Sequence, residues 1–193
     1  MLQNLNKYQI LLASNSPRRR ELLQGLDISY HVTSIPDIDE TYPADLSGEQ
    51  IPVYIARKKA TAYDQMMDEN TLLITADTIV WAEEQVFGKP KDKDDAIKML
   101  QTLAGKTHQV ITGVCIRTQH QEKSFASVTS VSFSNLSDEE ILYYVDKYKP
   151  FDKAGSYGIQ EWIGYVGVER IEGSYFNVMG LPIQRLYKEL QKF

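Results

Sequence analysis

Cysteine is nearly absent from this sequence of 193 residues, which contains Cys115 alone. A single cysteine forms no disulfide within the chain, and its apolar neighbours Val114 and Ile116 predict a reduced, buried thiol. We therefore expect a protein from a reducing compartment rather than a disulfide-stapled secreted scaffold.

Long apolar stretches are also lacking. The apolar run near the N-terminus covers only residues 10–13, which is too short for the core of a signal peptide and far from the ~18 apolar residues of a membrane span. The sequence therefore predicts a cytoplasmic protein without a membrane partner.

The chain has no excess of positive charge. Its 21 Lys and Arg residues are outnumbered by 26 Asp and Glu residues, for a net charge of −5. This balance argues against a nucleic acid polymer as a partner, because such proteins carry a broad basic surface. An anionic ligand would have to be bound by a local cluster of cations.

Several catalytic motifs are missing as well. The sequence contains neither the GxxxxGK[ST] phosphate loop nor the GxSxG nucleophile elbow. Its three histidines, His31, His108 and His120, share no spacing typical of metal ligands. A zinc site and a serine triad therefore have no support.

The composition is that of a folded globular protein, with 42% hydrophobic and 24% charged residues, and its length fits a single domain over residues 1–193. Apolar periodicity and turn residues predict strands at 7–14, 28–33, 71–82, 85–87, 107–118 and 123–133. The same signals predict helices at 17–26, from the capping box at 47–50 to about 68, at 92–103, from 137 to 148, and at 181–191. This mixture predicts an α/β fold with a mixed sheet and a cleft between two lobes.

The strongest local feature is the segment from Ser14 to Glu21, where a predicted strand ends and Pro17 begins a helix that carries three arginines. Such a turn directs backbone N–H groups and the positive end of a helix dipole at one place, and arginine suits phosphate oxygens. It could form an anion-binding site. An ordinary capped helix with a solvated basic face fits the local sequence equally well.

Asp77 lies within an apolar run, between Ile74 and Ile79. A buried, unpaired carboxylate would cost several kcal/mol, so a metal ion, a lysine or a water must compensate it. Each of these would make Asp77 a candidate base or ligand. Taken alone, an aspartate that caps a turn at the end of a strand is the simpler interpretation.

Other charged residues are weaker candidates. Lys58 and Lys59 lie in or beside the apolar face of the predicted long helix, where lysines commonly extend their ammonium groups to solvent. Lys89 is held in a Gly-Lys-Pro turn, which is a common tripeptide. The acidic loop contains Asp39 and Glu40, which could bind a hard cation but which fit a solvated loop better.

Taken together, eight segments resemble the Maf family of nucleoside triphosphate pyrophosphatases, a family named for an association with septum formation in bacteria. They are LLASNSPRRRELL at 11–23, Asp39-Glu40, Lys59-Ala60, ADTIV at 76–80, GKP at 88–90, GKTHQVITGV at 105–114, DKAGSYGIQ at 152–160 and GSYFNVMGLP at 173–182. The match extends over nearly the whole chain, and its order and spacing make it specific.

The resemblance implies an elongated, curved mixed sheet flanked by helices, similar to the inosine triphosphate pyrophosphatase architecture. It implies a nucleoside triphosphate substrate, cut between its α and β phosphates to give the monophosphate and pyrophosphate, and a divalent metal cation, Mg or Mn, as cofactor. The branch that this chain resembles acts on dTTP and UTP.

The resemblance also assigns roles to residues. It places the catalytic aspartate at Asp77, and the supporting groups at Arg19, Lys59, Lys89 and Glu40. In the mechanism we expect, Glu40 and Asp77 bind the metal, the turn with Ser14 and Ser16 holds phosphate, and the specificity positions are Arg18, Thr78 and Gln160.

The sequence leaves two alternative functions open and departs from the family pattern at one place. A 7-methyl-GTP pyrophosphatase and a nucleotide-binding regulator of septum formation with little hydrolysis are the alternative functions. Many relatives have glycine after the glutamine, whereas Glu161 and Trp162 follow Gln160 here, so the rim of the base pocket is not defined. A homodimer is one option for the oligomeric state.

Overall fold

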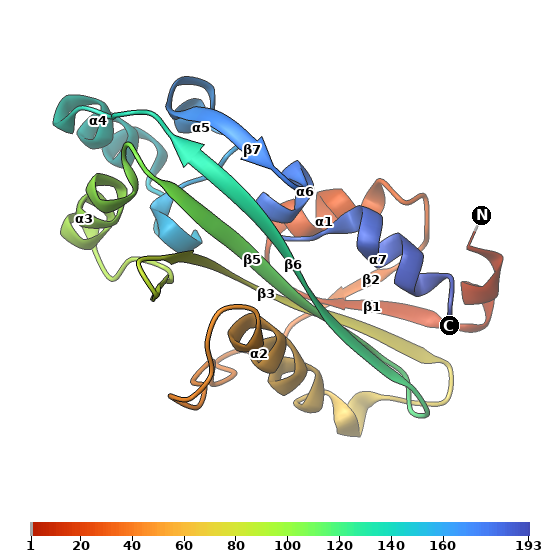
Figure 1. The fold of residues 1–193 in the computed structure, drawn as a ribbon. Coiled ribbons are helices and arrows are strands. Elements are labelled where there is room, and N and C mark those ends of the chain that lie inside the picture. The colour runs from red at the N-terminus through yellow and green to blue at the C-terminus, as the bar shows by residue number, and fades with distance from the viewer. Residues whose placement is uncertain (1) are drawn as a thin grey trace. The chain divides into compact units, whose positions relative to one another are not determined.

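The computed structural model describes residues 2–193 and shows a mixed α/β fold in which helices flank a seven-stranded sheet (Figure 1). The strand order is β2-β1-β3-β5-β6-β7, and β4 pairs with β3. β1 is parallel to β2 and β3, whereas β4 is antiparallel to β3 and β7 to β6, which confirms the expected mixed sheet. The strands are β1 (Gln9–Ala13), β2 (His31–Thr33), β3 (Thr71–Ala82), β4 (Gln85–Phe87), β5 (Thr107–Arg117), β6 (Glu122–Phe133) and β7 (Val168–Glu172).

The α-helices precede, separate or follow these strands along the chain. They are α1 (Pro17–Gln24), α2 (Gln50–Thr61), α3 (Lys93–Leu103), α4 (Asp138–Tyr148), α5 (Trp162–Gly167), α6 (Tyr175–Val178) and α7 (Ile183–Leu190). Among the described residues, no helix combines the length and the hydropathy that a membrane crossing requires.

The chain forms two compact units. The first contains the residues up to Asp77 together with Thr112–Ser127 and Gly180–Phe193. The second contains Thr78–Ile111 and Val128–Met179. The division passes through β3, between Asp77 and Thr78.

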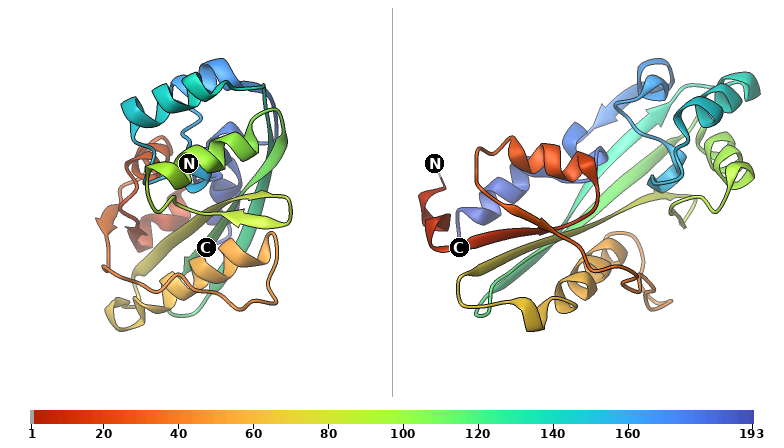
Figure 2. Two further views of the ribbon diagram at one scale, coloured as in Figure 1. Left: turned by 90° about the vertical axis from the view of Figure 1, so that its left-hand side faces the viewer. Right: turned by 180° about the vertical axis from the view of Figure 1, so that it is seen from behind.

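In the first unit, α2 lies on one face of the sheet, and α1 and α7 lie on the opposite face (Figures 1 and 2). Under α2, the alanines Ala56 and Ala60 pack with Tyr63, Leu73 and Cys115. Cys115 is a fully buried free thiol, as its apolar neighbours predict.

Two features hold α2 close to the sheet. Gly113 in β5 has no side chain, and a Cβ there would lie 2.2 Å from the carbonyl carbon of Pro52 in the first turn of α2. The buried hydroxyl of Thr75 in β3 donates a hydrogen bond of 2.7 Å to the carbonyl oxygen of Ala56. The helix is therefore fixed against β3 and β5 along its length, which positions the lysines in its last turn.

The second unit has its own core. Residues of α3, α4, β5 and β6 pack together with the segment that precedes α5, and the buried members include Leu100, Val131, Tyr144 and Tyr157. The His108 ring packs edge-on against Phe133 and Tyr157, with ring centroids 5.0 and 5.4 Å apart.

The structure corrects several predicted bounds. α2 ends at Thr61 instead of near residue 68, and a short 3-10 turn over Asp64–Met66 follows. Met66 is 58% exposed, so it adds no buried surface that would extend the helix beyond Tyr63. The predicted strand at 28–33 contains only His31–Thr33, since pairing with β1 is limited to these residues.

The capping box predicted at the start of α2 is also incomplete. The backbone N–H of Ser47 donates to the Gln50 side chain at 3.2 Å, but Glu49 occupies the cap position and forms no side-chain capping bond. The corresponding box at α4 is confirmed, with both hydrogen bonds between Ser137 and Glu140 present.

Candidate active site

Asp77 is compensated by a lysine. Its carboxylate comes from the middle of β3, with a side chain that is 11% exposed, and its Oδ1 atom is 2.7 Å from the ammonium of Lys59. Of the three partners that the sequence left open, the structure therefore contains the lysine. The alternative in which Asp77 merely caps a turn is wrong, because β3 continues to Ala82.

Lys59 also binds a second carboxylate. Its Nζ atom is 2.8 Å from Oε1 of Glu40, which comes from the acidic loop and is 47% exposed. One ammonium, itself 14% exposed, thus joins Asp77 and Glu40. The cluster brings together a strand, a helix and a loop of the first unit.

Lys58 has a different role. Its ammonium lies 2.7 Å from Oδ2 of Asp39 and donates to the carbonyl oxygen of Thr41 at 3.0 Å. The hydrogen bonds from Lys58 and Thr41 hold the pKa of Asp39 well below its ordinary value. The two adjacent lysines therefore attach loop residues 39–41 to α2, Lys58 on the solvent side and Lys59 on the side of Asp77.

Arg19 fixes the backbone next to Asp77. Its guanidinium donates from Nη1 to the carbonyl oxygen of Ala76 at 2.9 Å and from Nε to that of Gly180 at 2.7 Å. Burial lowers the pKa of Arg19, while the nearby charges of Asp77 and Glu40 raise it. Arg19 thus contributes a second cation to the same cluster and holds the strand that presents the aspartate.

The segment before Arg19 is a capped helix start. The side chain of Ser16 accepts a hydrogen bond of 3.4 Å from the Arg19 N–H, and the Ser14 hydroxyl accepts one of 3.2 Å from the Ser16 N–H. Pro17 occupies the first turn, where its missing N–H costs nothing. The predicted cap is confirmed, and phosphate binding by this turn and by Arg18 stays a prediction.

Three predicted site residues belong to the second unit. Thr78 directly follows Asp77 in β3 and is half-buried, and Lys89 is exposed in the segment between β4 and α3. Gln160 lies in the turn before α5, where the N–H of Glu161 donates to the carbonyl oxygen of Gly158 at 2.9 Å. The roles of these three residues stay predictions.

Two carboxylates of the first unit are of the donor type that a hard divalent cation prefers. No group of three or more acidic, histidine or cysteine ligands occurs within residues 2–193, so a metal cage made of protein alone is not present there. Glu40 and Asp77, however, supply two carboxylates at one ammonium. Mg²⁺ is commonly bound by one or two carboxylates and completed by substrate phosphates.

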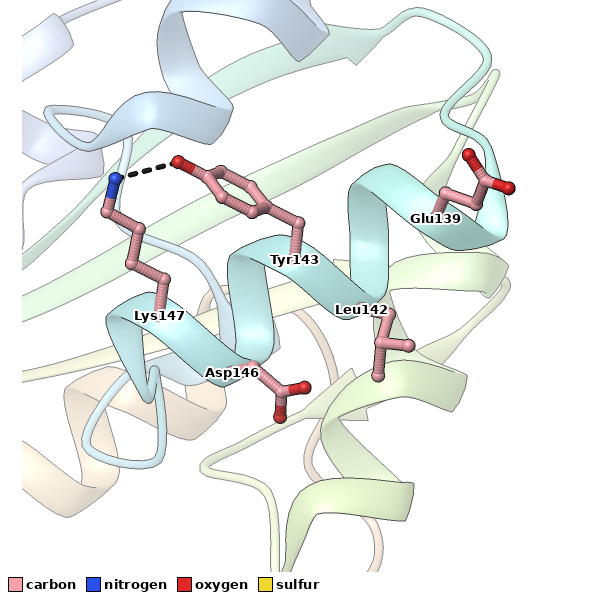
Figure 3. Close-up of a pocket in the computed structure, with 5 residues that line it drawn as sticks. All are labelled: Glu139, Leu142, Tyr143, Asp146 and Lys147. Carbon is pink, nitrogen blue, oxygen red and sulfur yellow. Dashed lines mark hydrogen bonds between the residues drawn. The ribbon is translucent and has the colours of Figure 1, made fainter.

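A surface hollow of about 500 Å³ lies elsewhere, along α4 of the second unit (Figure 3). All five lining residues come from this helix: Glu139, Leu142, Tyr143, Asp146 and Lys147. Leu142 and Asp146 project to one side of α4, and Tyr143 and Lys147 project to the other, where the ammonium donates to the tyrosine hydroxyl at 2.7 Å. The polar groups diverge, so this hollow has no convergent ligand set.

Sequence reasoning missed a buried polar group in the second unit. Lys153, Glu161 and Tyr144 contact one another beside the turn that carries Gln160. A signal was available, because Lys153 is the single charged residue within residues 153–159.

Comparison with known proteins shows the family of this chain. The sequence model of the family described as Maf-like protein matches residues 9–193. Proteins named dTTP/UTP pyrophosphatase from Phocaeicola vulgatus and Bacteroides fragilis are 64% and 62% identical to this chain over 192 residues, and each match covers 100% of both chains. One from Flavobacterium psychrophilum is 50% identical, covering 93% of this chain and 91% of its own.

Solved structures show the same fold at low identity. The Ham1 protein of Staphylococcus aureus has a TM-score of 0.52 and 18% identity, with 94% of this chain and 99% of that chain covered. A HAM1 protein from Coxiella burnetii has a TM-score of 0.50 and 15% identity, with 96% and 100% covered. The family match and the full-length relatives together show that this chain belongs to the Maf-like protein family.

Proposed function

We propose that this protein is a nucleoside triphosphate pyrophosphatase that hydrolyses dTTP and UTP to the monophosphate and pyrophosphate. The observation that carries the proposal is the pairing of Asp77 and Glu40 with the single ammonium of Lys59. The names of the full-length relatives support the choice of substrate.

The cluster contains the groups that the reaction requires. Cutting a phosphoanhydride needs an in-line water, a group that orients it or accepts its proton, and cations that offset charge on the phosphates. Asp77 is the acceptor, held in place by Lys59 and by the contact of Arg19 with Ala76. We assign phosphate binding to Arg18, to the turn at Ser14 and Ser16, and to Lys89.

Glu40 and Asp77 are the residues that would hold a divalent cation, Mg²⁺ or Mn²⁺. The ion would supply additional neutralisation of charge on the phosphate oxygens. Lys59 keeps the two carboxylates together before substrate and metal arrive, because its ammonium offsets their mutual repulsion.

We assign recognition of the base to Gln160, with Thr78 and Arg18 as further specificity positions. A primary amide donates and accepts hydrogen bonds at once. It can therefore accept from N3–H and donate to O4 of uracil or thymine. The buried Oε1 atom of Gln160 accepts no hydrogen bond from residues 2–193, so its capacity as an acceptor is not used within this part of the chain.

A direct assay tests the proposal. The purified chain is incubated with Mg²⁺ or Mn²⁺ and a panel of UTP, dTTP, CTP and 7-methyl-GTP, and pyrophosphate and orthophosphate are measured separately. We expect pyrophosphate from UTP and dTTP. Release of orthophosphate, a preference for 7-methyl-GTP, or nucleotide binding without hydrolysis would each contradict the proposal, the last in favour of a binding regulator.

A substitution at Gln160 tests base recognition. In Gln160→Ala the amide is lost, so the preference for UTP over CTP should fall by about tenfold or more, while the maximal rate changes less. The kcat/KM values for both nucleotides give the answer. An equal loss for UTP and CTP would show that the amide does not distinguish the bases.

A further inference from the structure

A nearly buried lysine lies beside the turn that carries Gln160. The side chain of Lys153 is 9% exposed, and its Nζ atom is 3.1 Å from Oε1 of Glu161 and 2.8 Å from Oδ1 of Asp152. Desolvating an ammonium is costly unless it is paired. Glu161, which is 20% exposed, is the more enclosed of its two partners, because the Asp152 side chain is 58% exposed.

Tyr144 connects this ion pair to the turn. Its hydroxyl, fully buried in α4, donates to Oε2 of Glu161 and accepts a hydrogen bond of 3.0 Å from the N–H of Gly158. Burial and the carboxylate raise the pKa of Tyr144, so the hydroxyl stays a neutral donor. One hydroxyl therefore fixes both ends of the turn from Gly158 to Glu161.

The packing of this turn leaves no free space. A Cβ on Gly158 would lie 2.8 Å from Cδ of Glu161 and 3.0 Å from Cε of Lys153. Glu161 also occupies the cap position of α5 without forming a side-chain bond to that helix. Its carboxylate serves Lys153 and Tyr144 instead, so the contact is not a by-product of helix capping.

The turn holds the residue whose orientation matters most for base selection. Uracil offers an acceptor at O4 and a donor at N3, whereas cytosine offers a donor at its amino group and an acceptor at N3. If the amide group of the glutamine rotates by 180°, its NH₂ group and its oxygen exchange places. The rotated amide then fits cytosine as well as the original amide fits uracil. Discrimination therefore requires that the backbone and side chain of Gln160 be held in one geometry.

We propose that Tyr144, Lys153 and Glu161 are positioning residues that set the preference for uracil and thymine by fixing the turn around Gln160. The proposal rests on the function proposed above and extends it to residues that do not touch the base. It requires that a substitution which makes the turn from Gly158 to Glu161 more mobile lower the preference for UTP over CTP more than it lowers the rate of UTP hydrolysis.

The test uses Tyr144→Phe with Tyr143→Phe as its matched control. The first variant removes the hydroxyl from the turn and keeps the ring, which stacks on Tyr148 at a centroid distance of 5.1 Å. The second removes the neighbouring hydroxyl, which binds only Lys147 among the contacts described for it. We expect the UTP-to-CTP ratio of kcat/KM to fall by about tenfold in Tyr144→Phe and to stay unchanged in the control.

Two further measurements distinguish a role in positioning Gln160 from a role in stability alone. Amide hydrogen exchange at Gly158 should become faster in Tyr144→Phe, because its acceptor is lost. Glu161→Gln keeps the size of the side chain but removes the more enclosed of the two carboxylates that pair with Lys153, and it should also lower the UTP-to-CTP ratio. If Tyr144→Phe does not fold, Glu161→Gln provides the test instead.

The outcomes are distinguishable. A UTP-to-CTP ratio in Tyr144→Phe and Glu161→Gln equal to that of Tyr143→Phe, despite a lower melting temperature, overturns this inference and leaves the proposed function intact. A wild-type protein that releases no pyrophosphate from UTP or dTTP overturns the proposed function and this inference with it.

Discussion

At the scale of single residues, two adjacent lysines show what sequence can and cannot resolve. The apolar periodicity of the helix places Lys58 and Lys59 at or beside the same face, and nothing in that pattern separates them. The resemblance selected Lys59, and the structure confirms that its ammonium contacts Asp77. The distinction depends on how α2 is rotated against β3, which the contacts of Ala56 and Ala60 with Leu73 determine.

The environments of the two lysines predict that their substitution lowers the free energy of unfolding by different amounts. Lys59→Met removes the ammonium that pairs with the nearly buried Asp77 and leaves Arg19 as the remaining nearby cation. We expect it to lower the free energy of unfolding by about 3 kcal/mol. Lys58→Met breaks an exposed pair with Asp39 and should lower the free energy of unfolding much less than Lys59→Met does. Urea denaturation at pH 7 measures both values. Equal losses would show that the Lys59 cluster has no special energetic role.

His108 predicts a pH dependence of stability. Burial lowers its pKa from 6.5 to about 4 in the folded protein. The unfolded chain therefore binds a proton between these values and the folded chain does not, so stability is complete above pH 6.5 and falls as the pH is lowered toward 4. Between pH 7 and pH 5 this residue alone should remove about 2 kcal/mol.

The measurement compares His108→Gln with the control His31→Gln, which changes an exposed histidine. Unfolding free energies at pH 7 and pH 5 should differ less in His108→Gln than in wild type. His31→Gln should keep the wild-type difference. A His108→Gln variant with an unchanged pH dependence would show that His108 is protonated equally in both states.

At the scale of elements, the core helices and strands could be predicted and the segment after Gln160 could not. α3 and α4 have apolar periodicity and clear caps, and β3 is a long run of apolar and β-branched residues. α5 has neither, since two of its six residues are glycines. Gly164 is required because a Cβ there would lie 1.8 Å from the carbonyl oxygen of Ile159, five residues earlier, a close approach that apolar periodicity does not reveal.

The contact between α2 and β5 gives a prediction at this scale. Gly113→Ala would place a Cβ against the backbone of Pro52, so α2 must shift. We expect a loss of about 1–3 kcal/mol of stability and a lower pyrophosphatase rate, since Lys59 moves with the helix. Gly25→Ala is the control, because its Cβ would meet its nearest atom at 3.4 Å. A Gly113→Ala protein with wild-type stability and rate would contradict the close packing.

At the scale of the whole molecule, the fold class followed from the order of elements and from the resemblance, while the site depended on long-range contacts. The α/β class with a mixed sheet is confirmed. Asp77 could be singled out as a buried charge, but its partner could not, because Glu40, Lys59 and Asp77 are separated along the chain and meet only in the folded first unit. Lys89, Thr78 and Gln160 stay predictions drawn from the resemblance.

The most direct test of the account is the rate of pyrophosphate release from UTP by Asp77→Asn, measured with Mg²⁺ or Mn²⁺ beside wild type. Asparagine keeps the shape of the side chain but accepts a proton poorly, so we expect the rate to fall by about 100-fold or more. Circular dichroism and UTP binding should stay close to those of wild type. A folded Asp77→Asn protein that releases pyrophosphate at the wild-type rate would remove Asp77 from the reaction and contradict the central claim.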